Sequence, residues 1–254
     1  MKRILTLTLI LSFAVVGNAV ESVWLGLDPG ARMGNLQVEY SYSKFNPQTL
    51  QQQTITKKKT YTSSGFGGGL IATLDFSPKF GLDIGAGYYQ NNYVLKDFKT
   101  DFESTGQIDM GPLMGIWGYT TTLKDDYKVD FTNIKVDLLG RYNFSPDSKV
   151  SPWVAFGPSI LMSTAKHIMP QMNFELKVVT GGAFMPTGTI ISSETVKSVE
   201  RTESKTNIAA AVGLGVNIAL SETVALCPSI KYEYTVSGWE GSAIYGQVAF
   251  KVKL

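Results

Sequence analysis

Residues 66–88, FGGGLIATLDFSPKFGLDIGAGY, contain the clearest structural pattern in this chain. In each half, apolar side chains alternate with small or polar ones, as in a β-strand that has one apolar face. The halves are separated by Ser77-Pro78-Lys79, a proline-containing polar segment typical of a tight turn. The stretch therefore predicts a β-hairpin, with Phe76 and Phe80 on either side of its turn.

The same alternation recurs along the chain and predicts an all-β fold of eight strands. These strands are expected at about residues 35–45, 66–76, 80–88, 129–144, 152–165, 207–220, 224–236 and 244–254. Short turns at 77–79, 145–151 and 221–223 alternate with long connections at 46–64, 94–128 and 166–205. Short turns on one side and long loops on the other are typical of outer-membrane barrels. We therefore expect an eight-stranded antiparallel up-and-down transmembrane β-barrel, with short periplasmic turns and long extracellular loops.

Two segments leave the strand assignment open. Residues 20–33 are expected to be irregular, because a turn signal at Asp28-Pro29-Gly30 interrupts them. The strand-like residues 174–196 are expected to form a hairpin beyond the membrane. A ten-stranded barrel is the alternative if that hairpin enters the lipid.

The N-terminus indicates export. Lys2 and Arg3, an apolar run over 4–16 and small residues before residue 20 predict a signal peptide at 1–19, followed by a single domain at 20–254. Without these two cations, the 23 basic and 21 acidic residues become 21 and 21, so nucleic acid is not an expected partner. No remaining stretch is apolar enough for a membrane helix. The exported chain is therefore either soluble or a membrane barrel.

Ten charged residues fall on the polar faces of the expected strands. These are Glu39, Asp75, Asp83, Asp137 and Glu233, with Lys135, Arg141, Lys231, Lys251 and Lys253. A lumen of about eight strands is just wide enough for side chains to fill, so five acids and five bases could pair there. An Arg or Lys facing lipid instead would cost roughly 2–4 kcal/mol at the midplane. A soluble sheet with these charges in water would show the same alternation.

Aromatic residues lie near the expected strand ends, where two membrane-interface girdles would place them. The expected girdle residues are Tyr42, Phe76, Phe80, Tyr88, Phe144, Trp153, Tyr234 and Trp239. The last strand alternates in the same way and is expected to insert with its apolar face toward lipid. Its apolar residues are Val248, Phe250, Val252 and Leu254.

The segments LDFSPKFGLDIGAGY at 74–88 and LLGRYNFSP at 138–146, with the closing amphipathic strand, resemble the small outer-membrane β-barrel superfamily. That group includes the OmpA-like membrane domain and the opacity and attachment-type surface barrels. The resemblance implies a Gram-negative outer membrane reached through the inner membrane, with lipid, lipopolysaccharide and the barrel-insertion machinery as partners. Members commonly end in Phe or Trp, whereas this chain ends in Leu254.

We expect a monomer with a structural or surface-recognition role carried by its loops, whose extracellular ligand the sequence does not name. The alternatives are a narrow porin or small-molecule passage channel, with a lateral gap near Pro158 as one route, and a soluble periplasmic ligand-binding β-barrel. No cofactor, metal site or enzyme activity is expected, because the single histidine, His167, lacks a neighbouring nucleophile pattern. His167 is expected in a surface loop. The basic run at 57–59 could meet a polyanion, although a solvated loop is the simpler interpretation.

Overall fold

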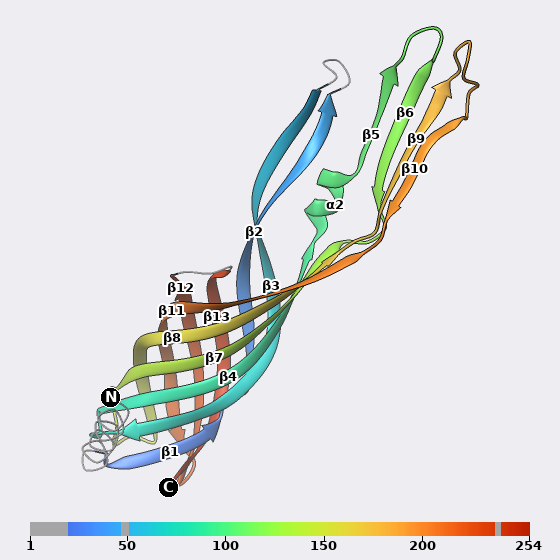
Figure 1. Ribbon diagram of the computed structural model, residues 1–254. Coiled ribbons are helices and arrows are strands. Elements are labelled where there is room, and N and C mark those ends of the chain that lie inside the picture. The colour runs from blue at the N-terminus through green and yellow to red at the C-terminus, as the bar shows by residue number, and fades with distance from the viewer. Residues whose placement is uncertain (1–19, 47–50, 237–239) are drawn as a thin grey trace, which may run out of the picture.

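The computed structural model describes residues 20–46, 51–236 and 240–254. Figure 1 shows a β-barrel whose strands continue far beyond one end. The predicted signal peptide lies outside the described residues. The elements are β1 Ser22–Leu27, β2 Gly30–Asn46, β3 Gln51–Asp75, β4 Phe80–Leu95, α2 Lys96–Phe102, β5 Ser104–Asp109, β6 Ile116–Leu123, β7 Tyr127–Asn143, β8 Val150–Met169, β9 Met172–Thr180, β10 Ile190–Val196, β11 Val199–Ala219, β12 Val224–Thr235 and β13 Glu240–Lys253. No helix among these elements is long and apolar enough to cross a membrane.

Eight strand positions close the ring. Seven are single strands in the order β13-β12-β11-β8-β7-β4-β3, and β1 and β2 together fill the eighth place between β3 and β13. Trp24 of β1 lies between Lys253 and Thr73, and Ala31 of β2 lies between Gly246 and Phe66. Within the part of the chain that the structure describes, the closed ring leaves no free sheet edge in the barrel.

The expectation that residues 20–33 are irregular is therefore wrong. They form β1 and the start of β2, interrupted at Asp28-Pro29. Pro29 lacks the backbone N–H that a continuous strand would use there, which explains the break. The sequence pattern indicated the turn correctly but not the strands that flank it.

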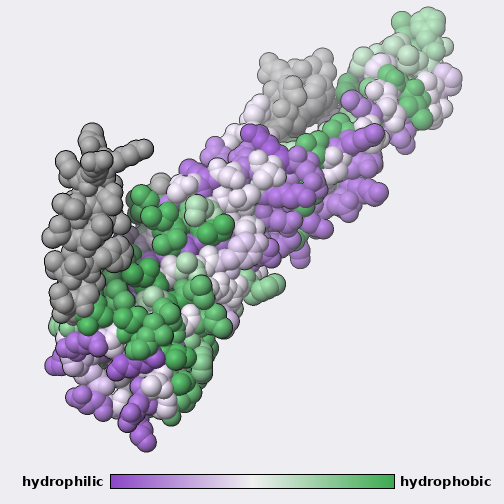
Figure 2. All heavy atoms as spheres, turned by 60° about the horizontal axis from the view of Figure 1, so that its bottom comes forward, coloured by the Kyte–Doolittle hydropathy of each residue, from purple (hydrophilic) through white to green (hydrophobic). Residues whose placement is uncertain are grey.

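The outward face of the barrel is apolar. On β7, Ile134, Val136 and Leu138 are 48%, 39% and 47% exposed, whereas Lys135 and Asp137 between them are buried. Hydrophobic side chains gather over the barrel in the space-filling view (Figure 2). A barrel surrounded by water would place its apolar residues inside. A continuous apolar exterior around a charged interior is the arrangement of a barrel in lipid.

The same strands reverse this polarity farther along. On β7, Val129 and Phe131 are buried, while Lys128 and Asp130 lie on the outer face. Side-chain direction alternates unchanged along a strand, so the environment has changed and not the register. The reversal between residues 131 and 134 indicates where lipid gives way to water. We call the barrel end beyond it the projecting end, and the opposite end, with the short turns, the turn end.

Two structures extend from the projecting end (Figure 1). The β2–β3 hairpin continues past the ring, and a separate four-stranded sheet has the order β10-β9-β6-β5. The hairpin expected at 174–196 is confirmed as β9 and β10. It lies in the second sheet and outside the ring, so the barrel has eight strands and not ten. The long connections are thus largely extended β-structure.

Candidate functional site

A network of buried charges fills the middle of the lumen. Lys135 Nζ lies 2.6 Å from Glu233 Oε1 and 3.1 Å from Asp137 Oδ2. Lys231 Nζ lies 3.0 Å from Asp137 Oδ2 and 3.8 Å from Asp28 Oδ2. β7 and β12, which lie apart in the ring, supply most of these side chains and project them inward across it. Because buried ions are tolerated only when paired, the network depends on all of its members.

A second charge cluster lies nearer the turn end. Arg141 Nη2 donates to Asp75 Oδ1 at 2.7 Å, and Arg141 Nη1 lies 3.4 Å from Asp83 Oδ1. Lys251 Nζ is 3.7 Å from the same Asp83 oxygen and donates to Thr73 Oγ1 at 2.8 Å. Thr73 in turn donates to Asp83. Four strands, β3, β4, β7 and β13, are joined through these contacts.

Eight of the ten predicted lumen charges lie in these two clusters; they are Asp75, Asp83, Lys135, Asp137, Arg141, Lys231, Glu233 and Lys251. Glu39 is exposed on the outer face of β2, so its placement in the lumen is wrong. It lies beyond the polarity reversal, where the inward positions are the buried Leu36 and Tyr40. Lys253 is exposed at the turn end, with Nζ 5.9 Å from the ring centroid of Trp24.

Two buried charges were not predicted. Asp28 and Arg32 flank the break between β1 and β2, in the segment expected to be irregular. With them, the described lumen holds five acids and five bases: Asp28, Asp75, Asp83, Asp137 and Glu233 with Arg32, Lys135, Arg141, Lys231 and Lys251. The interior is therefore neutral in formal charge. The alternation on either side of the Asp28-Pro29 turn was the signal that could have found both residues.

Arg32 forms the next layer toward the projecting end. Its Nε donates to Tyr245 Oη at 3.0 Å and its Nη1 donates to Asn91 Oδ1 at 2.6 Å. The Tyr245 ring also packs edge-on against Tyr89, with centroids 5.0 Å apart. Lys135 Nζ lies 3.9 Å from the Tyr245 ring centroid, which is a cation–π distance. This layer thus connects the charge network to the aromatic residues above it.

Apolar side chains close the projecting end. The cluster comprises Leu36, Tyr40, Tyr93, Leu95, Phe98, Leu123, Tyr127, Val129, Phe131 and Ala165. We call it the aromatic plug. Phe98, from the short helix α2, packs edge-on against Tyr40 with centroids 5.2 Å apart. Helix α2 therefore places part of the plug over the barrel opening.

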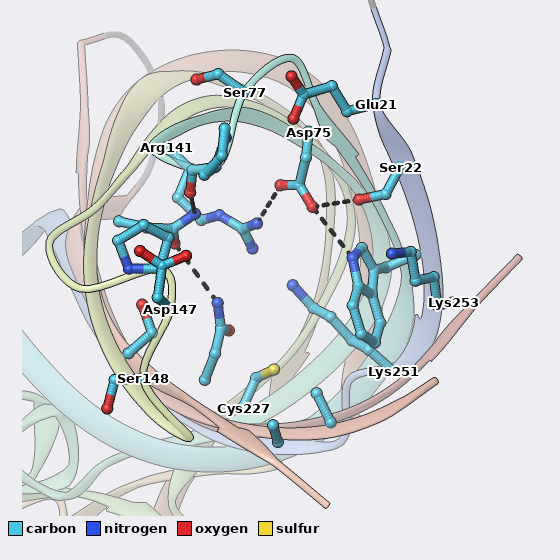
Figure 3. A pocket seen from close by; sticks show the side chains of 18 residues that line it. Glu21, Ser22, Asp75, Ser77, Arg141, Asp147, Ser148, Cys227, Lys251 and Lys253 are labelled. Atoms are coloured by element: carbon cyan, nitrogen blue, oxygen red, sulfur yellow. Dashed lines mark hydrogen bonds and ion pairs between the residues drawn. The ribbon is translucent and has the colours of Figure 1, made fainter. Parts of the chain in front are cut away.

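The turn end is open by comparison. A cavity of about 290 Å³ lies among Asp75, Arg141, Cys227 and Lys251 (Figure 3), with Lys251 pointing into it. Deeper in the lumen, near Asp137, the next cavity has only about 20 Å³, room for about one water molecule. The open space therefore narrows abruptly at the charge network.

The predicted girdle residues do not all lie on the same face of the barrel wall: most lie on the outer face, and one points into the lumen. Phe80 and Phe144 are exposed at the turn end and pack around Tyr142, with centroid distances of 5.1 and 5.2 Å. The outer face also carries Phe76, Tyr88 and Tyr234, and the predicted insertion residues Val248, Phe250, Val252 and Leu254. Trp239 and the side chain of Tyr42 lie outside the described residues.

Trp153 does not belong to a girdle, and that expectation is wrong. It is buried inside the lumen, because the odd-numbered positions of this part of β8 point inward. Two glycines of the neighbouring strand make room for its indole. A Cβ added at Gly215 would lie 2.4 Å from the Trp153 ring, and one at Gly213 would lie 3.4 Å from it.

His167 lies in strand β8 and not in a surface loop, so that expectation is wrong. Its Nδ1 is 2.6 Å from Tyr127 Oη, a contact that joins β8 to β7 beyond the polarity reversal. Burial lowers the pKa of His167 and raises the pKa of Tyr127 to about 12. Among the described residues, no group of three His, Cys, Asp or Glu side chains could hold a metal ion.

Comparison with known proteins agrees with this architecture. A family model for the outer membrane protein beta-barrel domain matches residues 6–251. The chain belongs to this family. It is a protein of the bacterial outer membrane, and the soluble periplasmic barrel considered above is thereby contradicted. A comparison with curated proteins gives no match.

Several solved structures resemble this family member at low sequence identity. Neisserial surface protein A is 14% identical, with 91% of this chain and 97% of that chain covered and a TM-score of 0.40. OprG from Pseudomonas aeruginosa is 13% identical, with coverages of 92% and 97% and a TM-score of 0.45. Ail of Yersinia pestis, in complex with the heparin analogue sucrose octasulfate, is 9% identical, with coverages of 91% and 99% and a TM-score of 0.35.

Proposed function

We propose that this protein is a non-conducting outer-membrane barrel that presents its projecting β-structure to a partner outside the cell. The observation that carries the proposal is the filled lumen. Paired charges occupy its middle, and the aromatic plug occupies its projecting end. A porin, in contrast, keeps an aqueous channel, usually within a wider barrel.

The lengths of the strands support a role outside the membrane. β3 has 25 residues and β11 has 21, whereas a tilted strand crosses a bilayer in roughly 9–11 residues. About half or more of each strand therefore lies beyond the hydrocarbon region. The additional sheet of β5, β6, β9 and β10 lies farther out still (Figure 1). An anchor alone would not need this structure.

Two lysines of the basic run at 57–59 form ion pairs with helix α2 at the projecting end. Lys59 Nζ lies 3.1 Å from Asp97 Oδ2 and 3.5 Å from Asp101 Oδ2, and Lys57 pairs with Asp101. These contacts hold α2, and with it Phe98 of the plug, against the β2–β3 hairpin. Lys58 is exposed and is the residue of the run best placed to meet anionic lipopolysaccharide.

The described backbone does not favour a lateral channel at Pro158. The register between β7 and β8 skips the positions around Pro158. Even so, a Cβ added at Gly157 would lie 2.1 Å from the Leu138 carbonyl oxygen. The backbones of the two strands therefore lie close together beside Pro158, which supports a closed wall there.

Conductance across a planar bilayer tests the proposal. Purified full chain should give no steady single-channel steps under conditions in which a general porin does. Steady steps whose size or ion selectivity changes on Arg141→Ala or Asp83→Ala would contradict the proposal and support the channel alternative, because both residues line the lumen.

A further inference from the structure

Two segments at the outermost end of the four-stranded sheet lack charge. Residues 110–123 and 178–193 contain no Asp, Glu, Lys, Arg or His. Charged residues flank both segments, at Asp109 and Lys124 and at Lys177 and Glu194. These segments include the β5–β6 and β9–β10 turns, which lie at the same end of the sheet because Ile116 pairs with Thr180. We call this end the apolar tip.

Large hydrophobic side chains of the apolar tip face solvent. Phe184 is 74% exposed, Ile190 61%, Leu113 54% and Met110 43%. The space-filling view shows hydrophobic residues at this far end, separated from the hydrophobic belt of the barrel by a mainly hydrophilic middle section (Figure 2). The belt faces the membrane in which the barrel lies. The apolar tip is a second, separate apolar surface at the opposite end of the molecule.

The apolar tip is also structured, because its two turns are joined backbone to backbone. The Ala183 N–H donates to the Pro112 carbonyl at 3.2 Å, and the Phe184 N–H donates to the Leu113 carbonyl at 3.0 Å. A Cβ added at Gly182 would lie 2.5 Å from the Gly115 nitrogen, so this approach requires glycine. The apolar side chains are thus held ready for contact, which reduces the entropy lost on binding.

An aromatic residue with a polar group lies just behind the exposed side chains. Trp117 is half-buried, and its indole Nε1 donates to the Met114 carbonyl at 2.9 Å. One charged side chain, Asp109, lies at the apolar tip itself, where its Oδ1 accepts a hydrogen bond from the Gly111 N–H at 2.8 Å. Lys177, which pairs with Ile190, forms a 3.0 Å ion pair with Glu175 on the side away from the turns. Exposed apolar side chains with an amphipathic aromatic residue behind them match the depth profile of a protein surface that enters a lipid interface.

We propose that the apolar tip inserts into the surface of a second lipid bilayer that faces the outer membrane. This inference rests on the proposed function, because it requires the sheet to lie outside the cell. A lipid surface fits better than a protein partner: specific protein interfaces surround their apolar centre with a polar rim that fixes orientation, whereas Asp109 is the single charged side chain at the described turns of the apolar tip, and a backbone N–H already binds its carboxylate. Insertion into lipid requires only exposed apolar side chains at the end of the molecule, which the apolar tip provides.

Flotation of nanodiscs with liposomes tests this inference. The full chain is embedded in nanodiscs, so that lipid covers the barrel belt and leaves the apolar tip free. Nanodiscs are mixed with phosphatidylcholine liposomes, with or without phosphatidylglycerol, and floated on a density gradient. The loaded nanodiscs should float with both kinds of liposome at low and high salt, because the contact is apolar and needs no ion pair with the lipid. Empty nanodiscs should remain at the bottom.

Paired variants make the test specific. The double variant Leu113→Asp/Phe184→Asp should float roughly tenfold less, because each change places a carboxylate where lipid would be. Val196→Asp is the matched control, since Val196 is exposed on the same sheet and pairs with Met172 at the end away from the tip. It should float like the wild type. Unboiled gel mobility confirms that each barrel has folded.

Three results would overturn the inference: a wild type that fails to float, a double variant that floats normally, or flotation only with anionic liposomes at low salt. Loaded nanodiscs that pair with each other but ignore liposomes would indicate a second copy as the partner, and would also overturn it. Failure of the proposed function is recognised separately. A barrel that does not conduct and does not float would contradict only the lipid inference. A barrel that conducts and floats would contradict only the proposal that the lumen is closed.

Discussion

At the residue scale, Lys135 holds the lumen network together. It is the only described cation with an ion pair to Glu233 within 4 Å, and it shares Asp137 with Lys231. Its Nζ also lies over the Tyr245 ring. Buried ion pairs contribute little net stability compared with apolar packing, but removing one partner leaves an uncompensated charge. The network therefore makes the ring sensitive to any change in which side chains face inward.

Replacing Lys135 measures this dependence. Lys135→Met should destabilise the folded barrel by roughly 3–5 kcal/mol, because Glu233 would stay buried without its cation. Urea unfolding in lipid vesicles is the measurement. Lys253→Met is the control, because Lys253 is an exposed lysine at the turn end of β13. This change should alter stability by no more than about 0.5 kcal/mol. Adding Glu233→Gln to Lys135→Met should recover much of the loss, and no recovery would contradict the pairing.

His167 should make the projecting end sensitive to pH. Burial holds its folded pKa below the ordinary value of 6.5, so the folded state favours the neutral ring. The opened state then binds more protons as the pH falls below that value. The contact with Tyr127 should contribute fully above about pH 6.5 and weaken as pH falls through 6.5 toward the lower folded pKa.

Hydrogen exchange of the β7 and β8 amides around Tyr127 and His167 tests this expectation. Protection should fall between about pH 7.5 and about pH 5 after correction for intrinsic exchange rates. In His167→Gln, which does not titrate, protection should be independent of pH. Equal protection at both pH values in the wild type would contradict the assignment.

Alternation along the sequence was enough to identify most lumen charges, because a strand has only two faces. It could not supply depth along the barrel axis. Glu39 was therefore assigned to the lumen although it lies beyond the lipid, where apolar side chains turn inward. Trp153 was assigned to the interface because it follows a turn. Its place inside depends on Gly213 and Gly215, which belong to a strand distant in sequence.

At the element scale, the long strands pass through two environments without a change of register. The outer face of β7 is apolar from Ile134 toward the turn end, and polar from Asp130 toward the projecting end. One continuous hydrogen-bonded ladder thus serves both as a membrane strand and as part of a water-soluble structure. The reversal from apolar-out to apolar-in is what fixes the depth of the barrel in the bilayer.

Lysine substitutions along the outer face of β7 test that depth. Leu138→Lys should destabilise the barrel by roughly 2–4 kcal/mol, because the ammonium group would lie in lipid. Thr132 lies six residues earlier on the same face of β7, on the projecting side of the reversal. Thr132→Lys should therefore lower the stability of the barrel by only about 0–1 kcal/mol. Urea unfolding in vesicles measures both changes. Equal effects at the two positions would mean that the reversal does not mark the lipid boundary.

Seven of the eight ring positions were predictable from the alternation of their strands, and their short turns carry Pro or Ser. The eighth position, filled by β1 and the start of β2, was expected to be irregular, and the predicted strand at 35–45 lies mainly in the projecting β2–β3 hairpin. β1, β5 and β6 were not predicted, for different reasons. β1 is only 6 residues long and ends at the Asp28-Pro29 break. β5 and β6 lie in a glycine-rich connection with no clear alternation, and they are ordered by pairing with β9, whose sequence lies far along the chain.

At the scale of the whole molecule, three layers follow one another along the long axis: an open cavity at the turn end, a lumen closed by charge pairs, and a projecting β-structure above the aromatic plug. The family and the belt of apolar residues place the barrel in the outer membrane. The proposed contact surface, the apolar tip, lies at the far end of the projection, well separated from the lumen.

Labelling of intact cells tests this arrangement most directly. Ser192→Cys lies on β10 of the projecting sheet, and Ser221→Cys lies in the turn between β11 and β12; both positions are exposed. The native Cys227 is buried and should stay silent. A membrane-impermeant maleimide should label Ser192→Cys on intact cells, and should reach Ser221→Cys only after the outer membrane is broken. Labelling of Ser221→Cys alone on intact cells would contradict the orientation, and labelling of both would contradict the membrane-spanning barrel.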